Sequence, residues 1–192
     1  PAVVDYKLDG VRVQVHRRGE EVRIFTRSLD DITARLPEVV AVAQSLPHDQ
    51  LVLDGEVLSL RSDGRPEAFQ VVASRTMSSV DVAALAQAGA LQVFFFDLLH
   101  VDGRDLLDAA LSERLELMRR LIPATVTVPR EICTTPEEAA DTFGDAVSRG
   151  YEGVVIKNLD APYAAGRRDS AWVKVKPRHT FDLIVTAAEW GH

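Results

Sequence analysis

The sequence has very few of the residues from which disulfide frameworks and zinc sites are built. Its single cysteine, Cys133, excludes an internal disulfide and any cysteine-rich zinc site. The five histidines are scattered without the spacing of metal ligands. The longest apolar runs are too short to span a bilayer, and the chain opens without a secretory signal pattern. These absences predict a protein of the cytoplasm, or of the nucleus in a eukaryote, without membrane contact.

Two further absences concern nucleotides and nucleic acids. The chain lacks the GxxxxGK(S/T) phosphate loop and the GxGxxG turn, as well as the GxSxG and HExxH motifs. If the chain binds a nucleotide, it must do so through a different sequence motif. The formal net charge of −7 argues against an extended surface for DNA phosphates, because such contacts need lysine and arginine. The positive charge is clustered, however, at 17–18, 167–168 and 174–178, and a local basic face is compatible with an acidic chain.

The 192 residues suit one domain, and the hydrophobic share of 46% is that of an ordinary globular chain. Alternating or continuous apolar residues predict strands over 11–15, 21–26, 51–60, 91–99, 154–158, 171–176 and 183–188. Helical spacing predicts helices over 33–46, capped by Asp31 or Thr33, over 66–74, 79–89 and 112–122, and from Thr135 onward. Because strands and helices do not alternate regularly, the pattern favours an α+β fold built on antiparallel sheets.

The segment from Lys7 to Arg12, KLDGVR, has the features of a reactive lysine. Lys7 stands at the junction of two short strands, and the turn Asp9-Gly10 is predicted to hold it at the mouth of a hairpin. Arg12 falls on the polar side of the next strand, within reach of an anion attacked by Lys7. A lysine amine is protonated at neutral pH, so nearby cations or desolvation must favour its neutral form before it can attack. The alternative interpretation is a solvated strand end followed by a common turn.

Lys7 belongs to the first of six short motifs. They are Asp5 to Arg12, Phe25 to Leu29, Asp54 to Glu56, Phe95 to Leu99, Glu152 to Lys157, and Trp172 to Lys176. In this order and rough spacing the chain resembles the covalent nucleotidyltransferases, whose signature is KxDGxR, and among them the ATP-dependent DNA ligases. The resemblance runs from Val4 to the last residue. It implies the adenylation core of a ligase, with two antiparallel sheets flanked by helices and an ATP-grasp-like architecture.

The resemblance also implies a role for each matching residue. Lys7 would attack the α-phosphate of ATP and carry AMP as a phosphoramidate. Glu56 and Glu152 would bind Mg²⁺, and Glu56 has the ribose hydroxyls as an alternative ligand. The other nucleotide contacts would be Asp5 with the adenine amino group, Phe96 and Val155 with the two faces of the base, Arg12, Arg27 and Arg168 with ribose and phosphates, and Lys174 and Lys176 with the α-phosphate.

Several of these residues also have an alternative interpretation that involves no nucleotide or a weaker contact with it. Position 5 is Asp where DNA ligases commonly carry Glu, so its reach to the base is one methylene shorter. The alternatives are an exposed strand residue for Glu56, a core residue for Phe96, and either a phosphate contact or a surface position for Lys157. Lys174 and Lys176 lie on one face of a strand. Two like charges side by side are unfavourable unless an anion joins them, so this pair favours phosphate binding even without the resemblance.

The resemblance covers one module of a ligase. It implies a nucleotidyltransferase domain over 1–180 and the first strand of a truncated OB domain over 181–192. The partners would be nicked double-stranded DNA and the flanking DNA-binding and OB domains of a longer, monomeric protein of DNA replication, repair or recombination. Rival functions are an RNA ligase or a capping-type nucleotidyltransferase, which share the lysine chemistry, and a non-catalytic domain that only binds DNA ends.

Overall fold

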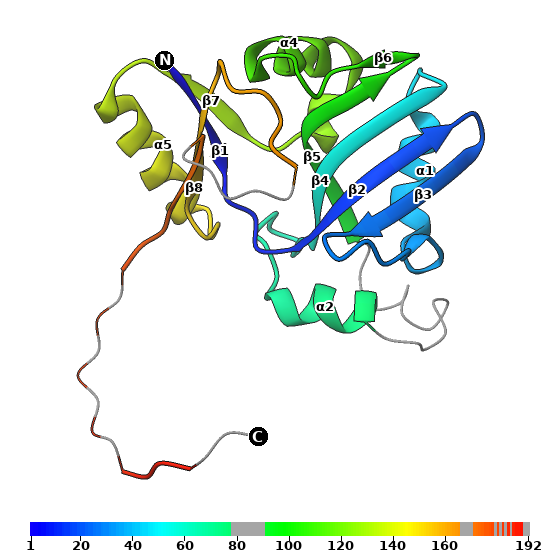
Figure 1. Ribbon diagram of the computed structural model, residues 1–192. Coiled ribbons are helices and arrows are strands. Elements are labelled where there is room, and N and C mark those ends of the chain that lie inside the picture. The colour runs from blue at the N-terminus through cyan, green and yellow to red at the C-terminus, as the bar shows by residue number, and fades with distance from the viewer. Residues whose placement is uncertain are drawn as a thin grey trace.

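Two antiparallel β-sheets organise the protein (Figure 1). The computed structural model describes residues 1–77, 91–165, 171–178, 180, 182, 184 and 186–189. The larger sheet has five strands in the order β3-β2-β4-β5-β6. Their bounds are Val11–Arg18 for β2, Glu21–Thr26 for β3, Gln50–Ser59 for β4, Leu91–Val101 for β5 and Arg104–Asp105 for β6. Alternate side chains such as Val13 and Ile24 are fully buried on one face, as the alternating pattern predicts.

The smaller sheet has four strands in the order β7-β1-β8-β9. Their bounds are Ala2–Tyr6 for β1, Arg130–Cys133 for β7, Val154–Asn158 for β8 and Trp172–Val175 for β9. β1 pairs with β7 and β8, whereas β2 pairs with β3 and β4, so residues 7–10 cross from one sheet to the other. Lys7 therefore lies between two strands, as predicted, but the predicted hairpin is wrong because the two strands belong to different sheets.

Four described helices cover the sheets. They are α1 Pro37–Ser45, α2 Phe69–Met77, α4 Leu111–Leu121 and α5 Pro136–Ser148. α1 contacts β2, β3 and β5, α2 contacts β2 and β4, α4 contacts β5, and α5 contacts β1, β7 and β8. In Figure 1, α5 lies beside the smaller sheet and α1 behind the larger one. The predicted α+β class with two antiparallel sheets flanked by helices is confirmed. In the described ranges, no helix combines the length and apolar character needed to cross a membrane.

The helix predicted over 33–46 begins later than expected, and neither Asp31 nor Thr33 caps it. Residues Thr33–Arg35 form a 3-10 turn, and α1 starts at Pro37 with Leu36 as an N-cap that makes no side-chain hydrogen bond. The ring of a proline disfavours a helical conformation in the residue before it, so the helical path is interrupted at Leu36. Proline itself suits the first helical position, where no N–H is needed.

Of the other predicted helices, one starts later than expected, one lies outside the described residues, and one starts where the sequence predicts. α2 begins at Phe69, three residues after the predicted start, and ends at Met77. The helix predicted over 79–89 lies outside the described residues. The capping box predicted at Thr135 is confirmed, because its side chain accepts from the Glu138 N–H while the Glu138 side chain accepts from the Thr135 N–H. α5 accordingly starts where the sequence indicates.

The strand predicted over 183–188 is wrong for the residues that can be compared. Ile184 and residues 186–189 belong to no strand, and Ile184 is 90% exposed. A strand requires a neighbour that satisfies its backbone N–H and C=O groups. No strand in the described part of the chain pairs with the described residues of this segment, which lie away from both sheets (Figure 1). Alternating apolar residues alone therefore do not make a strand here.

Candidate active site

Backbone hydrogen bonds hold Lys7 against the loop that precedes β8. Its N–H donates to the Gly153 carbonyl (2.8 Å), and the Glu152 N–H donates to the Lys7 carbonyl (3.2 Å). Gly153 has a φ of +139°, and a Cβ there would lie 2.1 Å from the Val175 carbonyl oxygen. Only glycine permits this conformation and this approach. The end of β1, the start of β8 and the end of β9 thus meet at Lys7.

The side chain of Lys7 forms an ion pair with the carboxylate of Glu152, which also pairs with Lys176. The Lys7 side chain is 14% exposed, so its amine is largely withdrawn from solvent. Burial tends to raise the pKa of Glu152, but hydrogen bonds from Lys176 and Lys7 outweigh it and hold this pKa below its usual value. Glu152 is therefore ionised at neutral pH and fixes the direction of the lysine amine.

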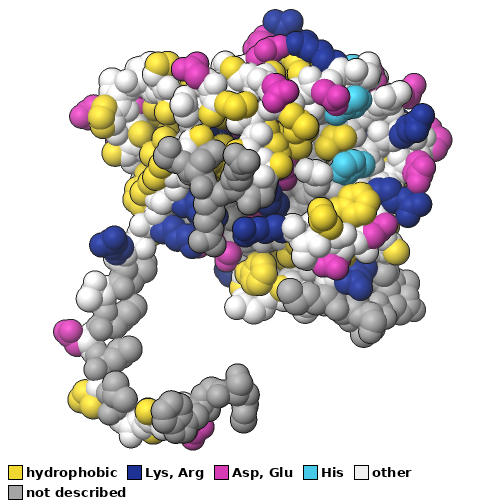
Figure 2. Space-filling view, in the orientation of Figure 1, with side chains coloured by type: hydrophobic (Ala, Val, Ile, Leu, Met, Phe, Trp, Pro, Cys, Tyr) yellow, Lys and Arg dark blue, Asp and Glu magenta, His cyan; other side chains and the backbone are white. Residues whose placement is uncertain are grey.

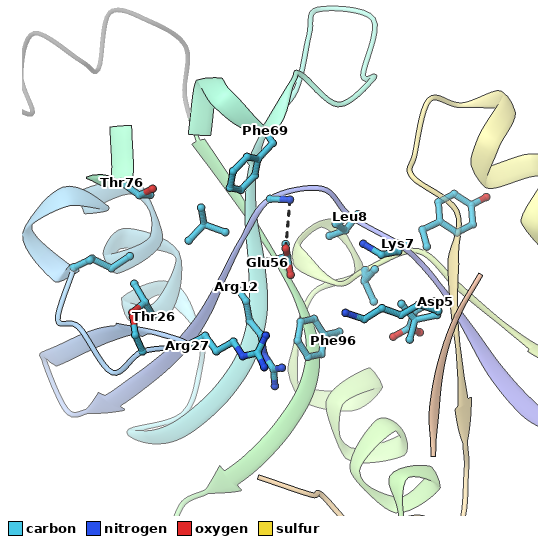
Figure 3. A pocket seen from close by; sticks show the side chains of 18 of the residues that line it. Asp5, Lys7, Leu8, Arg12, Thr26, Arg27, Glu56, Phe69, Thr76 and Phe96 are labelled. Carbon is cyan, nitrogen blue, oxygen red and sulfur yellow. Dashed lines mark hydrogen bonds between the residues drawn. The ribbon is translucent and has the colours of Figure 1, made fainter. Parts of the chain in front are cut away.

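A cleft of about 770 Å³ opens at the junction of the two sheets (Figure 3). Eight residues of the predicted site line it: Asp5, Lys7, Arg12, Arg27, Glu56, Phe96, Val155 and Lys174. Glu152 joins this group through its ion pair with Lys7, and Lys176 joins it through its ion pair with Glu152. Arg168 lies outside the described residues. Lys and Arg side chains gather around the hollow between the sheets (Figure 2), so an acidic chain concentrates positive charge at one place.

Phe96 reaches the cleft because β5 contains a bulge at this residue. Asp54 of β4 pairs with Asp97, and the next residue, Gly55, pairs with Phe95, so Phe96 has no partner across the strands. Phe95 is fully buried in the core, whereas Phe96 is 9% exposed and lines the cleft. The bulge decides which of the neighbouring phenylalanines is available to a ligand.

Asp5 is almost fully buried and already binds two cations. Its carboxylate accepts a hydrogen bond from the Lys157 amine (2.5 Å) and forms an ion pair with Arg130 (3.2 Å). The Lys157 amine lies 4.1 Å from the ring centroid of Trp172 and 4.7 Å from that of Phe96. A carboxylate with 2% exposure requires such partners, because an unpaired buried charge is strongly unfavourable. Asp5 is therefore one member of a charged network at the base of the cleft.

Three residues of this site, Trp172, Arg130 and Tyr163, had no role in the sequence-based prediction. For a fourth, Lys157, the sequence leaves a phosphate contact and a surface position open, and the surface position is wrong because Lys157 is 2% exposed. Lys157 and Trp172 stand in recognised motifs, and the only signal for Lys157 was its place two residues after Val155 on one strand. Arg130 and Tyr163 stand in no motif. Arg130 approaches Asp5 across 125 positions of sequence, and Tyr163 approaches Asp54 across 109. No local pattern reveals contacts of that separation.

Glu56 on β4 lies beneath the segment that carries Lys7. Its carboxylate accepts a hydrogen bond from the Gly10 N–H (3.3 Å), which is the dashed line in Figure 3. A Cβ on Gly10 would lie 2.2 Å from the Val57 carbonyl oxygen, so only glycine allows the two segments to approach this closely. Burial raises the pKa of Glu56 to about 7, although the Gly10 N–H and the charges of Lys7 and Arg12 lower it. Glu56 thus changes its charge near neutral pH.

We expect the stability of the fold to depend on pH through Glu56. Its folded pKa of about 7 lies above the ordinary 4.5, so the folded protein keeps a proton that the unfolded chain loses between these values. The free energy of unfolding should therefore fall as the pH rises through this range. Glu56→Gln cannot ionise, so its stability relative to the wild type should increase by about 2–3 kcal/mol from about pH 5 to about pH 8. Urea unfolding of both proteins measures this difference, and parallel pH profiles would contradict it.

The fold and the order of motifs around the cleft define a nucleotidyltransferase domain, and a solved structure agrees. A mycobacterial DNA ligase D in complex with ATP superposes with a TM-score of 0.76 and is 34% identical. The match covers 91% of this chain and 54% of that one. Both the architecture and a third of the residues are therefore shared with a ligase.

Sequence relatives identify the family. The family model of the ATP-dependent DNA ligase domain matches residues 1–176. A probable DNA ligase of Streptomyces avermitilis is 55% identical over 192 residues, covering 98% of this chain, and one of Streptomyces coelicolor is 55% identical over 194 residues. The chain belongs to the ATP-dependent DNA ligase domain family. It spans 38% of the length of each of these two relatives.

Proposed function

We propose that this chain is the adenylation module of an ATP-dependent DNA ligase, which forms a covalent lysine–AMP at Lys7 and passes AMP to the 5′-phosphate at a nick. The observation that carries the proposal is the placement of Lys7, whose amine enters a basic cleft between two sheets with Glu152 bound to it. The names of the Streptomyces relatives support a DNA substrate. The ATP in the mycobacterial ligase D structure supports the nucleotide.

In the first step the protonated Lys7 amine loses one proton to solvent, and the neutral amine attacks the α-phosphorus of ATP. A second proton leaves the nitrogen for solvent as the new bond forms. A phosphorus–nitrogen bond forms while the bond to pyrophosphate breaks, so AMP becomes attached to the lysine. Such a transfer depends on in-line placement and on stabilisation of charge more than on acid–base catalysis. Lys174, which lines the cleft, and Lys176, which binds Glu152, would stabilise the charge that develops on the α-phosphate.

The rest of the nucleotide would contact residues of both sheets. Adenine would pack between Phe96 and Val155, and Asp5 would accept a hydrogen bond from its amino group. The pairing of β1 with β8 sets Asp5 opposite Val155, which favours contact of both with one ligand. Arg12 and Arg27, which line the cleft, and Arg168 would hold the ribose and phosphates. Stacking gives affinity for any base, whereas a polar contact is needed to select adenine.

Glu56 and Glu152 would bind Mg²⁺ at this cleft. The donor chemistry fits, because Mg²⁺ is bound in proteins by one or two carboxylates and keeps waters and phosphate oxygens as its other ligands. Lys7 pairs with Glu152 and its charge acts on Glu56, so both carboxylates lie near the nucleophile. The bound ion would neutralise phosphate charge during the transfer.

The proposal extends to the organisation of the whole protein. Residues 1–180 would form the nucleotidyltransferase domain, and 181–192 would begin an OB domain. Together with a DNA-binding domain, that OB domain would hold nicked double-stranded DNA over the cleft. The protein would act as a monomer in the cytoplasm, in DNA replication, repair or recombination.

Covalent labelling tests the proposal directly. Incubation with Mg²⁺ and ATP labelled at the α-phosphate should attach the label to the protein, and intact-mass spectrometry should show the addition of one AMP. GTP should label it far less, because one lost polar contact to the base is worth roughly 1–3 kcal/mol. Preferential labelling by GTP would indicate a capping-type enzyme, and transfer of AMP to RNA ends alone would indicate an RNA ligase. Tight binding of DNA ends without any labelling would indicate a non-catalytic domain.

A further inference from the structure

Arg12 lies at the edge of the proposed nucleotide site, bound to a buried carboxylate. Its Nε donates to Asp54 Oδ1 (3.0 Å) and its Nη2 donates to Asp54 Oδ2 (2.5 Å). The Asp54 side chain is 1% exposed and that of Arg12 is 39% exposed. The guanidinium carbon lies 5.6 Å from the ring centroid of Phe96, the proposed platform for adenine. Arg12 is thus fixed on one side and open to a ligand on the other.

Tyr163 contacts both members of this ion pair through one hydroxyl. Its Oη donates to Asp54 Oδ2 (2.8 Å) and accepts a hydrogen bond from Arg12 Nη2 (3.2 Å). Burial raises the pKa of Tyr163 well above its usual value, and the Asp54 carboxylate adds to this rise, so the hydroxyl keeps its proton at neutral pH. Within the described residues, Nε and Nη2 of Arg12 are engaged and its Nη1 has no hydrogen-bond partner.

A short connecting segment, residues 159–163, brings Tyr163 from the smaller sheet onto the larger one. The segment leaves β8 and is fixed to α4 and to the loop before it. Three backbone hydrogen bonds do this: Ser112 N–H to the Leu159 carbonyl (2.8 Å), Leu111 N–H to the Ala161 carbonyl (3.0 Å), and Tyr163 N–H to the Leu107 carbonyl (2.8 Å). Arg114, which forms a buried ion pair with Asp97 (2.8 Å), also donates to the Ala161 carbonyl (3.3 Å). These bonds fix the backbone of Tyr163, so its hydroxyl is held beside Arg12 and Asp54.

We propose that Tyr163 is a positioning residue for nucleotide binding, whose hydroxyl locks the Arg12–Asp54 pair so that Nη1 of Arg12 faces the ribose or phosphates. The inference rests on the proposed function, because it places the nucleotide in this cleft. Without the hydroxyl, Asp54 loses a donor and Nη2 loses an acceptor, so only the two bonds to Asp54 hold the guanidinium and its orientation is less restricted. Arg12 would then point at the nucleotide only part of the time, which weakens binding without changing the bond-making atoms.

Removal of one oxygen tests this role. Tyr163→Phe should raise the KM for ATP in self-adenylation about tenfold, the effect of one lost hydrogen bond to a charged group. The kcat should stay within about twofold, because an interaction equal in ground and transition states affects KM alone. Tyr151→Phe is the matched control, since the described residues offer no hydrogen bond to that hydroxyl and Tyr151 does not line the cleft. It should leave both constants unchanged.

A double-mutant cycle separates positioning from general support of the fold. Arg12→Lys keeps a cation beside Asp54 but lacks the second guanidinium edge. In that background, Tyr163→Phe should change the KM by less than about twofold. Losses that multiply in the double variant, an unchanged KM in the single variant, or a loss confined to kcat would each overturn the inference. Each assay is run below the melting temperature of the variant, measured by circular dichroism.

The same experiment distinguishes this inference from the proposed function. If the wild type forms no lysine–AMP, both fail. If the wild type forms it and Tyr163→Phe has the wild-type KM, only the positioning role fails.

Discussion

Lys7→Ala should abolish covalent labelling by ATP while the protein stays folded. A phosphoramidate needs a neutral amine at the α-phosphorus, and Lys7 supplies the amine that Glu152 holds in the cleft. We expect the labelling rate to fall by roughly a thousandfold or more, as when a nucleophile is removed from other enzymes. Autoradiography after denaturing electrophoresis and the intact mass measure the loss. Glu152 keeps Lys176 as a partner in the variant, so its carboxylate is not left unpaired.

The small number of lysines makes the result easy to interpret. The sequence has four, and three of them, Lys7, Lys157 and Lys174, line the cleft, while Lys176 pairs with Glu152. Lys7→Arg is the matched control, because it keeps the positive charge beside Glu152 but cannot lose its proton. It should also remain unlabelled. AMP recovered on any of the other three lysines in either variant would refute the assignment of Lys7.

Sealing of nicked DNA by the 192-residue chain alone should be about a thousandfold slower than sealing by a full-length relative near physiological salt. DNA affinity rises with the number of neutralised phosphates. This chain has a net charge of −7 and few basic clusters outside the cleft, so alone it can neutralise few phosphates. The missing contacts would come from the flanking DNA-binding and OB domains. A nick-sealing assay across a salt series, with the Streptomyces avermitilis relative for comparison, measures the difference.

Lowering the salt should raise the sealing rate of the isolated chain by a larger factor than that of the full-length relative, because the relative is already close to saturation with DNA whereas the isolated chain binds only a small fraction of it. A chimera in which this chain replaces the matching region of the relative should recover sealing. That control shows that the chain carries a working adenylation site. Equal sealing rates for the isolated chain and the full-length relative at high salt would contradict the idea that it forms only one module of a larger clamp.

Features of the fold that depend on neighbouring residues were predictable. The capping box of Thr135 and Glu138 forms because a side chain and a backbone group four residues apart or fewer meet in any helix start. The continuous apolar run over 91–99 is a buried strand, and the alternation of β2 buries Val13 and Val15. Apart from the cap at Asp31 or Thr33 and the starts of two helices, the predictions that failed concerned strand pairing: the hairpin at Lys7 and the strand over 183–188. An alternating apolar pattern predicts a strand but does not show which other strand, if any, it pairs with.

The candidate site, like the fold, was predictable from the sequence only in part. The sequence by itself determined which chemical groups are present, namely the lysine of KLDGVR, two glutamates, clustered cations and a phenylalanine run. The tertiary structure decided how they meet: Glu152 at Lys7, Lys157 and Arg130 at Asp5, Tyr163 at Arg12, and the bulge that turns Phe96 into the cleft. The physical reason is that charge and hydrogen-bonding capacity belong to single residues and can be read in order. Their mutual distances depend on the pairing of strands more than a hundred residues apart, which is set only when both sheets have formed.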